Sequence, residues 1–259
     1  MRRELLEFVQ SNLTRKNRKN CVSNIQFSND FYVVEFPKSG ITWFTVLLAN
    51  TFLANQGSRD KATFSSVRSY IPDLEANPNL QAFEFTCPQV RLYKSHSEFS
   101  ADYVNIVYIA RNPVDVMNSY YRYQKGMGSF DGSFEEFCFG SPFGIDAWRR
   151  HVNSWFVDNV NYANRFIHLV RYEDLVRETA GEIQQLAENF GWNIDADAIT
   201  QAVDLSSRGA MREQEELARR RNPGYKFEFV SAGRSGTTDD ELARRLEDMR
   251  KDECILLGY

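Results

Sequence analysis

Residues 37–42, PKSGIT, lie between the short apolar segment FYVVEF and a longer apolar segment that begins at Trp43. A turn from a strand into a helix presents the unpaired N–H groups and partial positive charge of the helix amino terminus. Gly40 lets the backbone approach a ligand closely, and Lys38 adds a full positive charge. The turn is not a Walker A loop, because it lacks the first glycine and the lysine after the second. It predicts a site for a phosphate ligand other than a magnesium-bound nucleoside triphosphate; the alternative is a tight turn with a surface lysine.

Arg111 is a second candidate for anion binding. It follows the apolar segment VNIVYIA and precedes a helix whose expected N-cap is Asn112. Its planar guanidinium can donate two hydrogen bonds to one phosphate. Ser119 lies nearly two helical turns after Asn112, so it can face the same ligand. The alternatives are an ion pair between Arg111 and Asp115 and an ordinary helical position for Ser119.

The segment VRLYKSH, residues 90–96, carries a candidate catalytic base. By the strand period of two, Lys94 and His96 share a face with two apolar residues. The ordinary histidine pKa lies near neutral pH, so a histidine at the end of a strand can accept a proton from a substrate. Of the other two histidines, His168 lies in an apolar strand and is expected to pack there, whereas His151 lies in a helical segment and is open to either interpretation.

Apolar segments of two kinds alternate along the chain and predict the elements that position these candidates. Short segments rich in β-branched and aromatic residues predict strands at 31–36, 90–93, 104–110 and 165–170. Segments with helical spacing predict helices at 43–54, 113–123, 183–190 and 242–249. The alternation predicts an α/β fold with a mostly parallel central sheet flanked by helices. Ligands of such sheets bind beyond the carboxyl ends of the strands, where the three candidate segments lie.

The composition is that of an ordinary globular protein. The 259 residues have a formal net charge of −4, and 20 Phe, 12 Tyr and 4 Trp are too many for a disordered chain. Net acidity argues against a nucleic-acid-binding domain. We expect no secretory signal, because Glu4, Glu7 and Gln10 interrupt the amino-terminal apolar stretch, and no membrane span, because no apolar run reaches the about 20 residues that one needs. Because the four cysteines are widely separated, we expect a cytoplasmic protein without a metal site. We expect one domain over residues 1–259, with residues 1–28 as an approach segment.

Four motifs occur in order along the chain: PKSGITW, KSH, YIARNPVDVMNSYY and RYEDL. Together they resemble the cytosolic-type sulfotransferases, which use 3'-phosphoadenosine 5'-phosphosulfate (PAPS). The resemblance implies a P-loop-like fold, sulfuryl transfer from PAPS and no metal. It implies His96 as the catalytic base, with Lys38 and Lys94 stabilising charge near the sulfuryl group. The donor-binding residues that it implies are Lys38, Ser39, Gly40, Ile41, Thr42 and Trp43 around the 5'-phosphosulfate and adenine side, Arg111 and Ser119 at the 3'-phosphate, Tyr172 near the adenine, and Ser207.

The chain departs from this family pattern at three places. Ile41 stands where Thr or Asn is usual, so only its backbone N–H remains for the 5'-phosphate. Arg208 follows Ser207 where an aromatic residue is usual, and its guanidinium can stack on adenine instead. The segment FVSAGRSG lacks the Arg-Lys pair of the family's glycine-rich loop. Gly233 is retained there, and Arg234 is expected to supply the missing cation.

The expected reaction is in-line transfer of a sulfuryl group from PAPS to a hydroxyl or amine of a small-molecule, saccharide or lipid acceptor. The motifs specify neither the acceptor nor an oligomeric state. Two other interpretations stay open. One is a catalytically degenerate protein that binds adenosine 3',5'-bisphosphate, and the other is a different P-loop-like nucleotide-dependent transferase or kinase.

Overall fold

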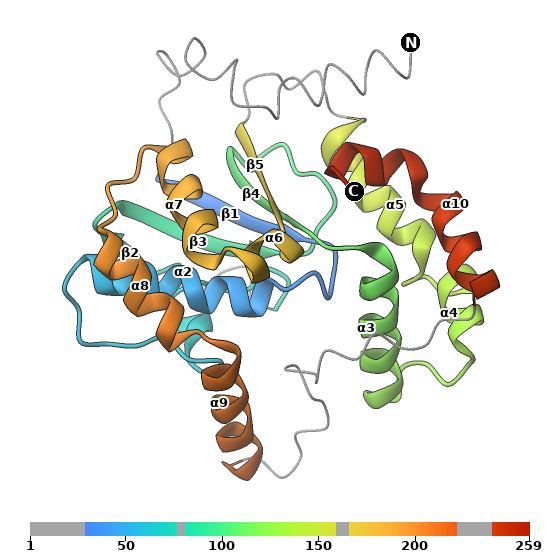
Figure 1. Ribbon diagram of the computed structural model, residues 1–259, viewed down its shortest axis with the longest axis horizontal. Helices are drawn as coiled ribbons and strands as arrows, with labels where there is room; N and C mark the ends of the chain where they lie inside the picture. The colour runs from blue at the N-terminus through green and yellow to red at the C-terminus, as the bar shows by residue number, and fades with distance from the viewer. Residues whose placement is uncertain (1–28, 77–80, 159–165, 222–239) are drawn as a thin grey trace.

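A five-stranded sheet in the order β2-β3-β1-β4-β5 forms the centre of the molecule (Figure 1). The computed structural model describes residues 29–76, 81–158, 166–221 and 240–259. The strands are β1 (Asp30–Glu35), β2 (Glu84–Thr86), β3 (Gln89–Ser95), β4 (Asn105–Ala110) and β5 (Phe166–Arg171). All neighbouring pairs are parallel except β2 and β3. The predicted mostly parallel sheet is therefore confirmed.

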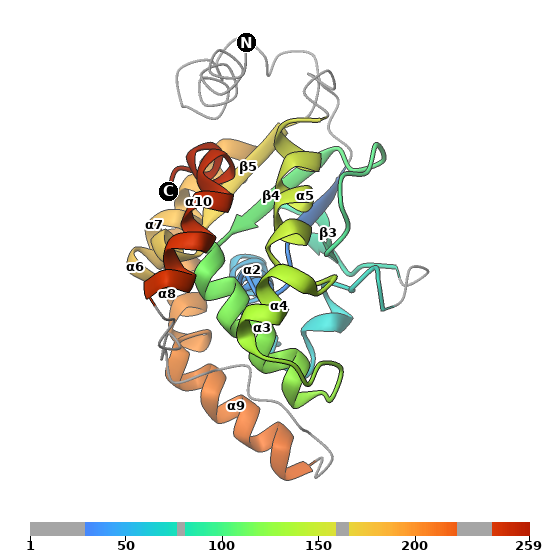
Figure 2. The ribbon, with the colours of Figure 1, turned by 90° about the vertical axis from the view of Figure 1, so that its right-hand side faces the viewer.

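Helices cover both faces of this sheet (Figures 1 and 2). One layer contains α2 (Ile41–Asn55), α7 (Thr179–Phe190) and α8 (Ala196–Leu205). The other contains α3 (Pro113–Gly126), α4 (Phe134–Gly140), α5 (Ile145–Phe156) and α10 (Asp240–Leu257). Three further elements are η2 (Val67–Ser69), α6 (Tyr172–Arg177) and α9 (Arg208–Arg221). Figure 1 shows α9 projecting away from the sheet.

Each face of the sheet has its own hydrophobic core. Val33 of β1 belongs to the core that includes Leu47 of α2 and Leu186 of α7. The next residue, Val34, belongs to the opposite core, which includes Trp148 of α5. Because successive strand residues point to opposite faces, a strand that is covered on both sides is apolar throughout. This explains why the strands appear in the sequence as continuous apolar runs.

Local chemistry determines where the helices next to the predicted site begin and end. The Asn112 side chain accepts a hydrogen bond from the N–H of Val114 at 3.0 Å, which confirms it as the N-cap of α3. Helix α7 ends, as predicted, at Gly191, whose φ is 69°. Helix α2 begins at Ile41, two residues earlier than predicted, because Gly40 completes the preceding turn with a φ of 116°.

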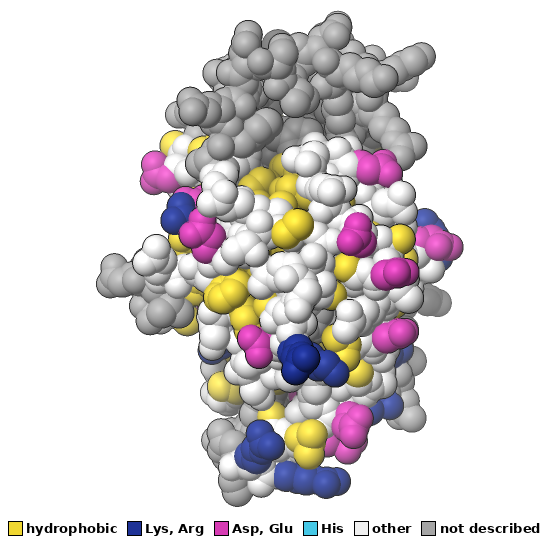
Figure 3. All heavy atoms as spheres, turned by 90° about the vertical axis from the view of Figure 1, so that its left-hand side faces the viewer, with side chains coloured by type: hydrophobic (Ala, Val, Ile, Leu, Met, Phe, Trp, Pro, Cys, Tyr) yellow, Lys and Arg dark blue, Asp and Glu magenta, His cyan; other side chains and the backbone are white. Residues whose placement is uncertain are grey.

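The large exposed apolar side chains of the described residues come from several parts of the fold. On the face drawn in Figure 3, hydrophobic side chains are interspersed with acidic and basic ones. Large exposed apolar side chains come from separate elements, among them Val176 of α6, Leu217 of α9 and Ile255 of α10. None of the helices in the described ranges is long and apolar enough to cross a membrane. The predicted approach segment, residues 1–28, lies outside the described residues.

Candidate active site

The loop of residues 37–42 turns sharply between β1 and α2. Gly40 has a φ of 116° and Lys38 a φ of 79°, a left-handed conformation that non-glycine residues seldom adopt. The N–H and the hydroxyl of Ser39 both donate to the carbonyl of Phe36, at 3.3 and 2.9 Å. The loop is thus held in the form of a tight, internally bonded turn.

The amino terminus of α2 points its N–H groups into this loop. The buried carboxylate of Glu35 accepts the N–H of Ile41, the first residue of α2, at 2.7 Å, and also the N–H of Lys38 in the loop at 3.2 Å. The N–H groups of Thr42 and Trp43 have no partner among the residues that the structure describes. The helix terminus therefore keeps donors for an anionic ligand.

Arg111 and Tyr172 are brought together by the pairing of β4 with β5. The two strands are paired to their ends, so the residues that follow them lie side by side. The Arg111 guanidinium lies 4.6 Å from the centroid of the Tyr172 ring, and its Nη1 donates to the carbonyl of Lys38 at 3.3 Å. Both side chains lie in the described part of the chain, and Arg111 contacts Lys38 and Tyr172 rather than Asp115, so the alternative of an ion pair with Asp115 is wrong. Arg111 therefore lies against the loop of residues 37–42, the predicted anion loop.

Trp43 connects this cluster to the beginning of α9. Its ring meets that of Tyr172 edge to face at 5.9 Å, and its Nε1 donates to the carbonyl of Ser206 at 2.7 Å. The hydroxyl of Ser207, the next residue, accepts a hydrogen bond from the N–H of Ala210 at 3.3 Å. Residues far apart in the sequence thus meet around Trp43.

The Lys38 side chain is a desolvated cation. Its Nζ lies 4.5 Å from the centroid of the Tyr123 ring of α3. Burial lowers the pKa of Lys38, the carboxylate of Glu35 opposes this effect, and Arg111 adds to it, so that the resulting pKa is about 8. Lys38 is still charged at neutral pH, and an anionic ligand will favour its charged form further.

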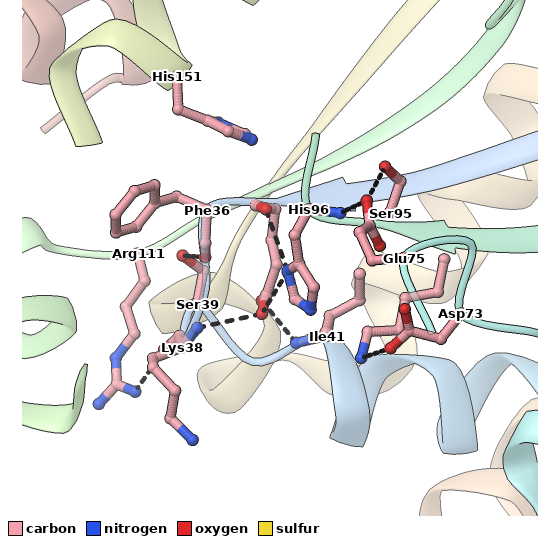
Figure 4. Close-up of polar contacts among 12 residues, drawn as sticks. Phe36, Lys38, Ser39, Ile41, Asp73, Glu75, Ser95, His96, Arg111 and His151 are labelled. Atoms are coloured by element: carbon pink, nitrogen blue, oxygen red, sulfur yellow. Dashed lines mark hydrogen bonds and ion pairs between the residues drawn. The ribbon is translucent and has the colours of Figure 1, made fainter. Parts of the chain in front are cut away.

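His96 leaves β3 beside the end of β1. The parallel register pairs the residues just before His96 and Glu35, so these two side chains face each other. The His96 Nδ1 lies 3.4 Å from the carbonyl oxygen of Glu35 and 3.8 Å from its Oε1 (Figure 4). Burial and then Lys94 lower the pKa of His96 to about 4, whereas Asp73 and Glu75 oppose them. The imidazole is therefore neutral at pH 7, as a base must be.

Lys94 is paired with an acidic partner. Its Nζ lies 2.8 Å from Oδ2 of the buried Asp73. Burial alone would raise the pKa of Asp73, but the hydrogen bond from Lys94 brings it down to about 2. The neighbouring Glu75 accepts hydrogen bonds from the Ser95 hydroxyl and the His96 N–H, each at 2.7 Å. Figure 4 shows these acids on the opposite side of His96 from Arg111.

The other two histidines are buried, and each has a hydrogen-bond partner within the fold. His168 is buried, and its Nδ1 lies 2.8 Å from the Asn189 amide nitrogen, which agrees with the predicted packing. His151 is also buried, with its Nδ1 2.8 Å from the hydroxyl of Tyr108. Within the described residues, no group of three or more His, Cys, Asp or Glu side chains could hold a metal ion.

Three predicted donor-binding residues are not joined to the cluster by any described contact. Ser119 is half-buried on α3 and makes no side-chain hydrogen bond within the described ranges. Gly233 and Arg234 lie outside the described residues. Their roles stay predictions.

Three acidic residues next to His96 were missed by the sequence analysis. Glu35 left a signal, because it is the one charged residue in the apolar segment FYVVEF. No feature of the sequence pointed to Asp73 or Glu75 as residues of the site. They reach the site because Asp73 pairs with Lys94 as an isolated parallel bridge, a contact between distant segments.

A mostly parallel sheet with helices on both faces defines the class of α/β proteins. Within this class, the family model described as "Sulfotransferase domain" matches residues 7–249, and the chain belongs to that family. Human Sulfotransferase 4A1 is 30% identical over 182 residues, which cover 64% of this chain and 61% of the relative. Rat Sulfotransferase 1A1 is 27% identical over 203 residues, 71% of this chain and 67% of the relative. The chain thus spans less than two thirds of the length of the Sulfotransferase 4A1 proteins that it matches.

Solved structures agree with this fold. Retinol dehydratase in a complex with retinol and PAP matches with a TM-score of 0.64 and 18% identity, over 87% of this chain and 81% of that chain. Mouse sulfotransferase SULT7A1 complexed with PAP matches with a TM-score of 0.59 and 16% identity, over 97% and 89% of the two chains. The predicted sulfotransferase-type α/β fold is confirmed.

Proposed function

We propose that the protein is a PAPS-dependent sulfotransferase, which transfers a sulfuryl group to an acceptor hydroxyl or amine. One observation carries this proposal beyond family membership: Arg111 donates to the carbonyl of Lys38, next to the open N–H groups of α2. Two cation sites that are distant in the sequence thus meet at one helix terminus. Such an arrangement suits a ligand with more than one anionic group.

The donor is proposed to bind along this cluster. The 5'-phosphosulfate would be surrounded by six successive residues of the loop and the start of α2: Lys38, Ser39, Gly40, Ile41, Thr42 and Trp43. The 3'-phosphate would be bound by Arg111, Ser119 and Arg234, the last of which is far from the other two in the sequence. Gly233 would allow the backbone to approach the phosphate closely. The rings of Tyr172 and Trp43 and the segment at Ser207 would lie next to the adenine.

Transfer is proposed to use His96 as the general base. Its Nδ1 faces the Glu35 carbonyl, which leaves Nε2 as the nitrogen that can accept the proton of the acceptor. The acceptor oxygen forms a bond to sulfur while the bond from sulfur to the phosphate oxygen breaks. Lys38 and the N–H groups of its loop would stabilise the charge on the departing oxygen. Lys94 would contribute at the sulfuryl group after exchanging part of its contact with Asp73 for the donor.

The proposed acceptor is a small molecule, with saccharides and lipids as further candidates. Retinol dehydratase has been solved with androsterone and with retinol, together with PAP. Apolar alcohols are therefore the first acceptors to test on this chain. Aromatic side chains packed around the second core, such as Tyr123, Phe130 and Phe143, offer apolar walls for such a molecule.

Nucleotide binding tests the donor site directly. Adenosine 3',5'-bisphosphate should raise the unfolding temperature more than AMP, because only the bisphosphate offers a 3'-phosphate to Arg111. A ligand at 100 times its Kd should add about 2.7 kcal/mol to the free energy of unfolding. Equal shifts with the two nucleotides would contradict the assignment of Arg111.

An acceptor screen with sulfur-labelled PAPS tests the transfer. Label on an apolar alcohol, formed without added magnesium, supports the proposal. Bisphosphate binding with no transfer to phenols, alcohols, sugars or amines would indicate a degenerate binder. Turnover of ATP that requires magnesium would indicate a kinase instead.

A further inference from the structure

Glu35 is a buried acid that the proposed reaction does not yet use. It is the last residue of β1, and only 2% of its surface is exposed. An ionised carboxylate in such a place requires partners that compensate for lost hydration. Its two oxygens have them: Oε1 accepts the N–H of Lys38, and Oε2 accepts the N–H of Ile41. Glu35 therefore holds the start of the anion loop in place.

The same residue faces the proposed base. Oε1 lies 3.8 Å from His96 Nδ1, and the Glu35 carbonyl oxygen lies 3.4 Å from the same nitrogen. A proton on Nδ1 is favoured by both oxygens, so Nε2 is left free to accept one. Figure 4 shows the His96 ring directed toward the loop that carries Ser39 and Ile41.

We propose that Glu35 is a positioning residue for His96: its carbonyl oxygen holds the Nδ1–H, and its carboxylate stabilises the imidazolium that forms during transfer. This inference rests on the proposed sulfotransferase function. In the transfer step the acceptor O–H bond breaks and its proton binds Nε2. The acceptor oxygen bonds to sulfur, and the bisphosphate leaves with the electron pair of the broken S–O bond. The positive charge thus created on His96 lies beside the negative charge of Glu35.

Several charged or titratable groups surround this pair. Lys38 lies in the loop and Lys94 on β3; Asp73 and Glu75 lie beside His96; Tyr108 of β4 and His151 of α5 complete the surroundings. Burial raises the pKa of Glu35 to about 7, although Lys94, the Ile41 N–H and Lys38 oppose it. The pKa of His96 is lowered to about 4. Glu35 should therefore gain its proton near pH 7, whereas His96 stays neutral until near pH 4.

The pH dependence of turnover separates this role from a purely structural one. Above pH 7 Glu35 is ionised and can stabilise the imidazolium, whereas below pH 7 it is neutral. Glu35→Gln has the shape of the protonated acid but never carries the charge. We expect the variant to lose about tenfold or more in kcat at pH 8 and to approach the parent within about threefold at pH 5.5. A variant damaged only in its loop would be slower by the same factor at both values.

Nucleotide binding and a matched substitution serve as controls. Adenosine 3',5'-bisphosphate should shift the unfolding temperature of Glu35→Gln at least as much as that of the parent, because the buried negative charge is gone. Glu84→Gln, at an exposed position on β2, removes a charge away from the site and should leave kcat unchanged. Loss of kcat together with loss of nucleotide binding in Glu35→Gln, at every pH, would overturn the proposal.

Nuclear magnetic resonance of the ring nitrogens tests the pair without donor or acceptor. With ¹⁵N-labelled histidine, His96 at pH 8 should carry its proton on Nδ1 and should sense a titration near pH 7. That step should be absent in Glu35→Gln, and His96→Gln identifies the signals. A proton on Nε2, or identical titrations in parent and variant, would overturn the role of Glu35 even if transfer is confirmed. If the spectra are as expected but the protein transfers no sulfuryl group, the result would count against the proposed function and not against the pairing of Glu35 with His96.

Discussion

Gly40 provides the sharpest structural test of the anion loop. Its φ is 116°, and a Cβ built on it would lie 2.5 Å from Cδ2 and 2.9 Å from Cε2 of the Tyr172 ring. Gly40→Ala must therefore accept an unfavourable backbone conformation and also displace the ring. Because the Arg111 guanidinium lies over that ring at 4.6 Å, the displacement also disturbs the proposed 3'-phosphate site.

Gly57, just beyond the other end of α2, offers a matched control. Its φ is 71°, and no heavy atom lies within 4 Å of the position of an added Cβ. Gly57→Ala should lose only the backbone cost, about 1–2 kcal/mol of unfolding free energy. Gly40→Ala adds the loss of the cation–π contact, roughly 0.5–2 kcal/mol, so its total should be roughly 1.5–4 kcal/mol.

Urea unfolding of the two variants measures this difference, and calorimetric titration with adenosine 3',5'-bisphosphate measures the effect on the site. We expect Gly57→Ala to bind as the parent does and Gly40→Ala to bind at least tenfold more weakly, about 1.4 kcal/mol. Equal destabilisation in the two variants with unchanged binding in both would refute the close packing of Tyr172 against the loop.

Three further predictions concern the base, the missing cation and the buried histidine. His96→Ala should keep the nucleotide-induced thermal shift but lose at least about 10²-fold in turnover; a variant that retains most of its turnover would remove His96 from the mechanism. Arg234→Ala should weaken binding of adenosine 3',5'-bisphosphate and change AMP binding much less, and calorimetry with both nucleotides checks this. Burial lowers the pKa of His151 to about 3, so the folded protein binds fewer protons here than the unfolded chain between pH 6.5 and 3, and stability falls as pH drops through that window. Urea unfolding at pH 7 and 5 should show a smaller loss in His151→Gln, and equal losses would contradict the burial of a neutral imidazole.

The local parts of the site could be predicted because their signals are local. The turn at Gly40, the N-cap at Asn112 and the end of a helix at Gly191 each depend on a few neighbouring residues. The apolar runs around them predicted strands that are covered on both faces, and from these the parallel sheet follows. The predicted boundaries of α2 and α10 were less accurate: α2 begins two residues earlier, directly after the turn at Gly40, and α10 continues to Leu257, beyond its most regular apolar spacing.

The contacts between residues of the candidate site could not be predicted from such local signals. The sequence by itself determined that Lys38, Arg111 and His96 follow strands, and therefore that they lie at one edge of the sheet. Only the tertiary structure decided that Arg111 covers the Tyr172 ring, because that contact depends on the register of two strands joined by a long crossover. The same holds for Glu35, whose charge was visible in the sequence but whose partners were not. A carboxylate can be buried only where N–H groups and cations converge on it, and that convergence is a property of the folded chain.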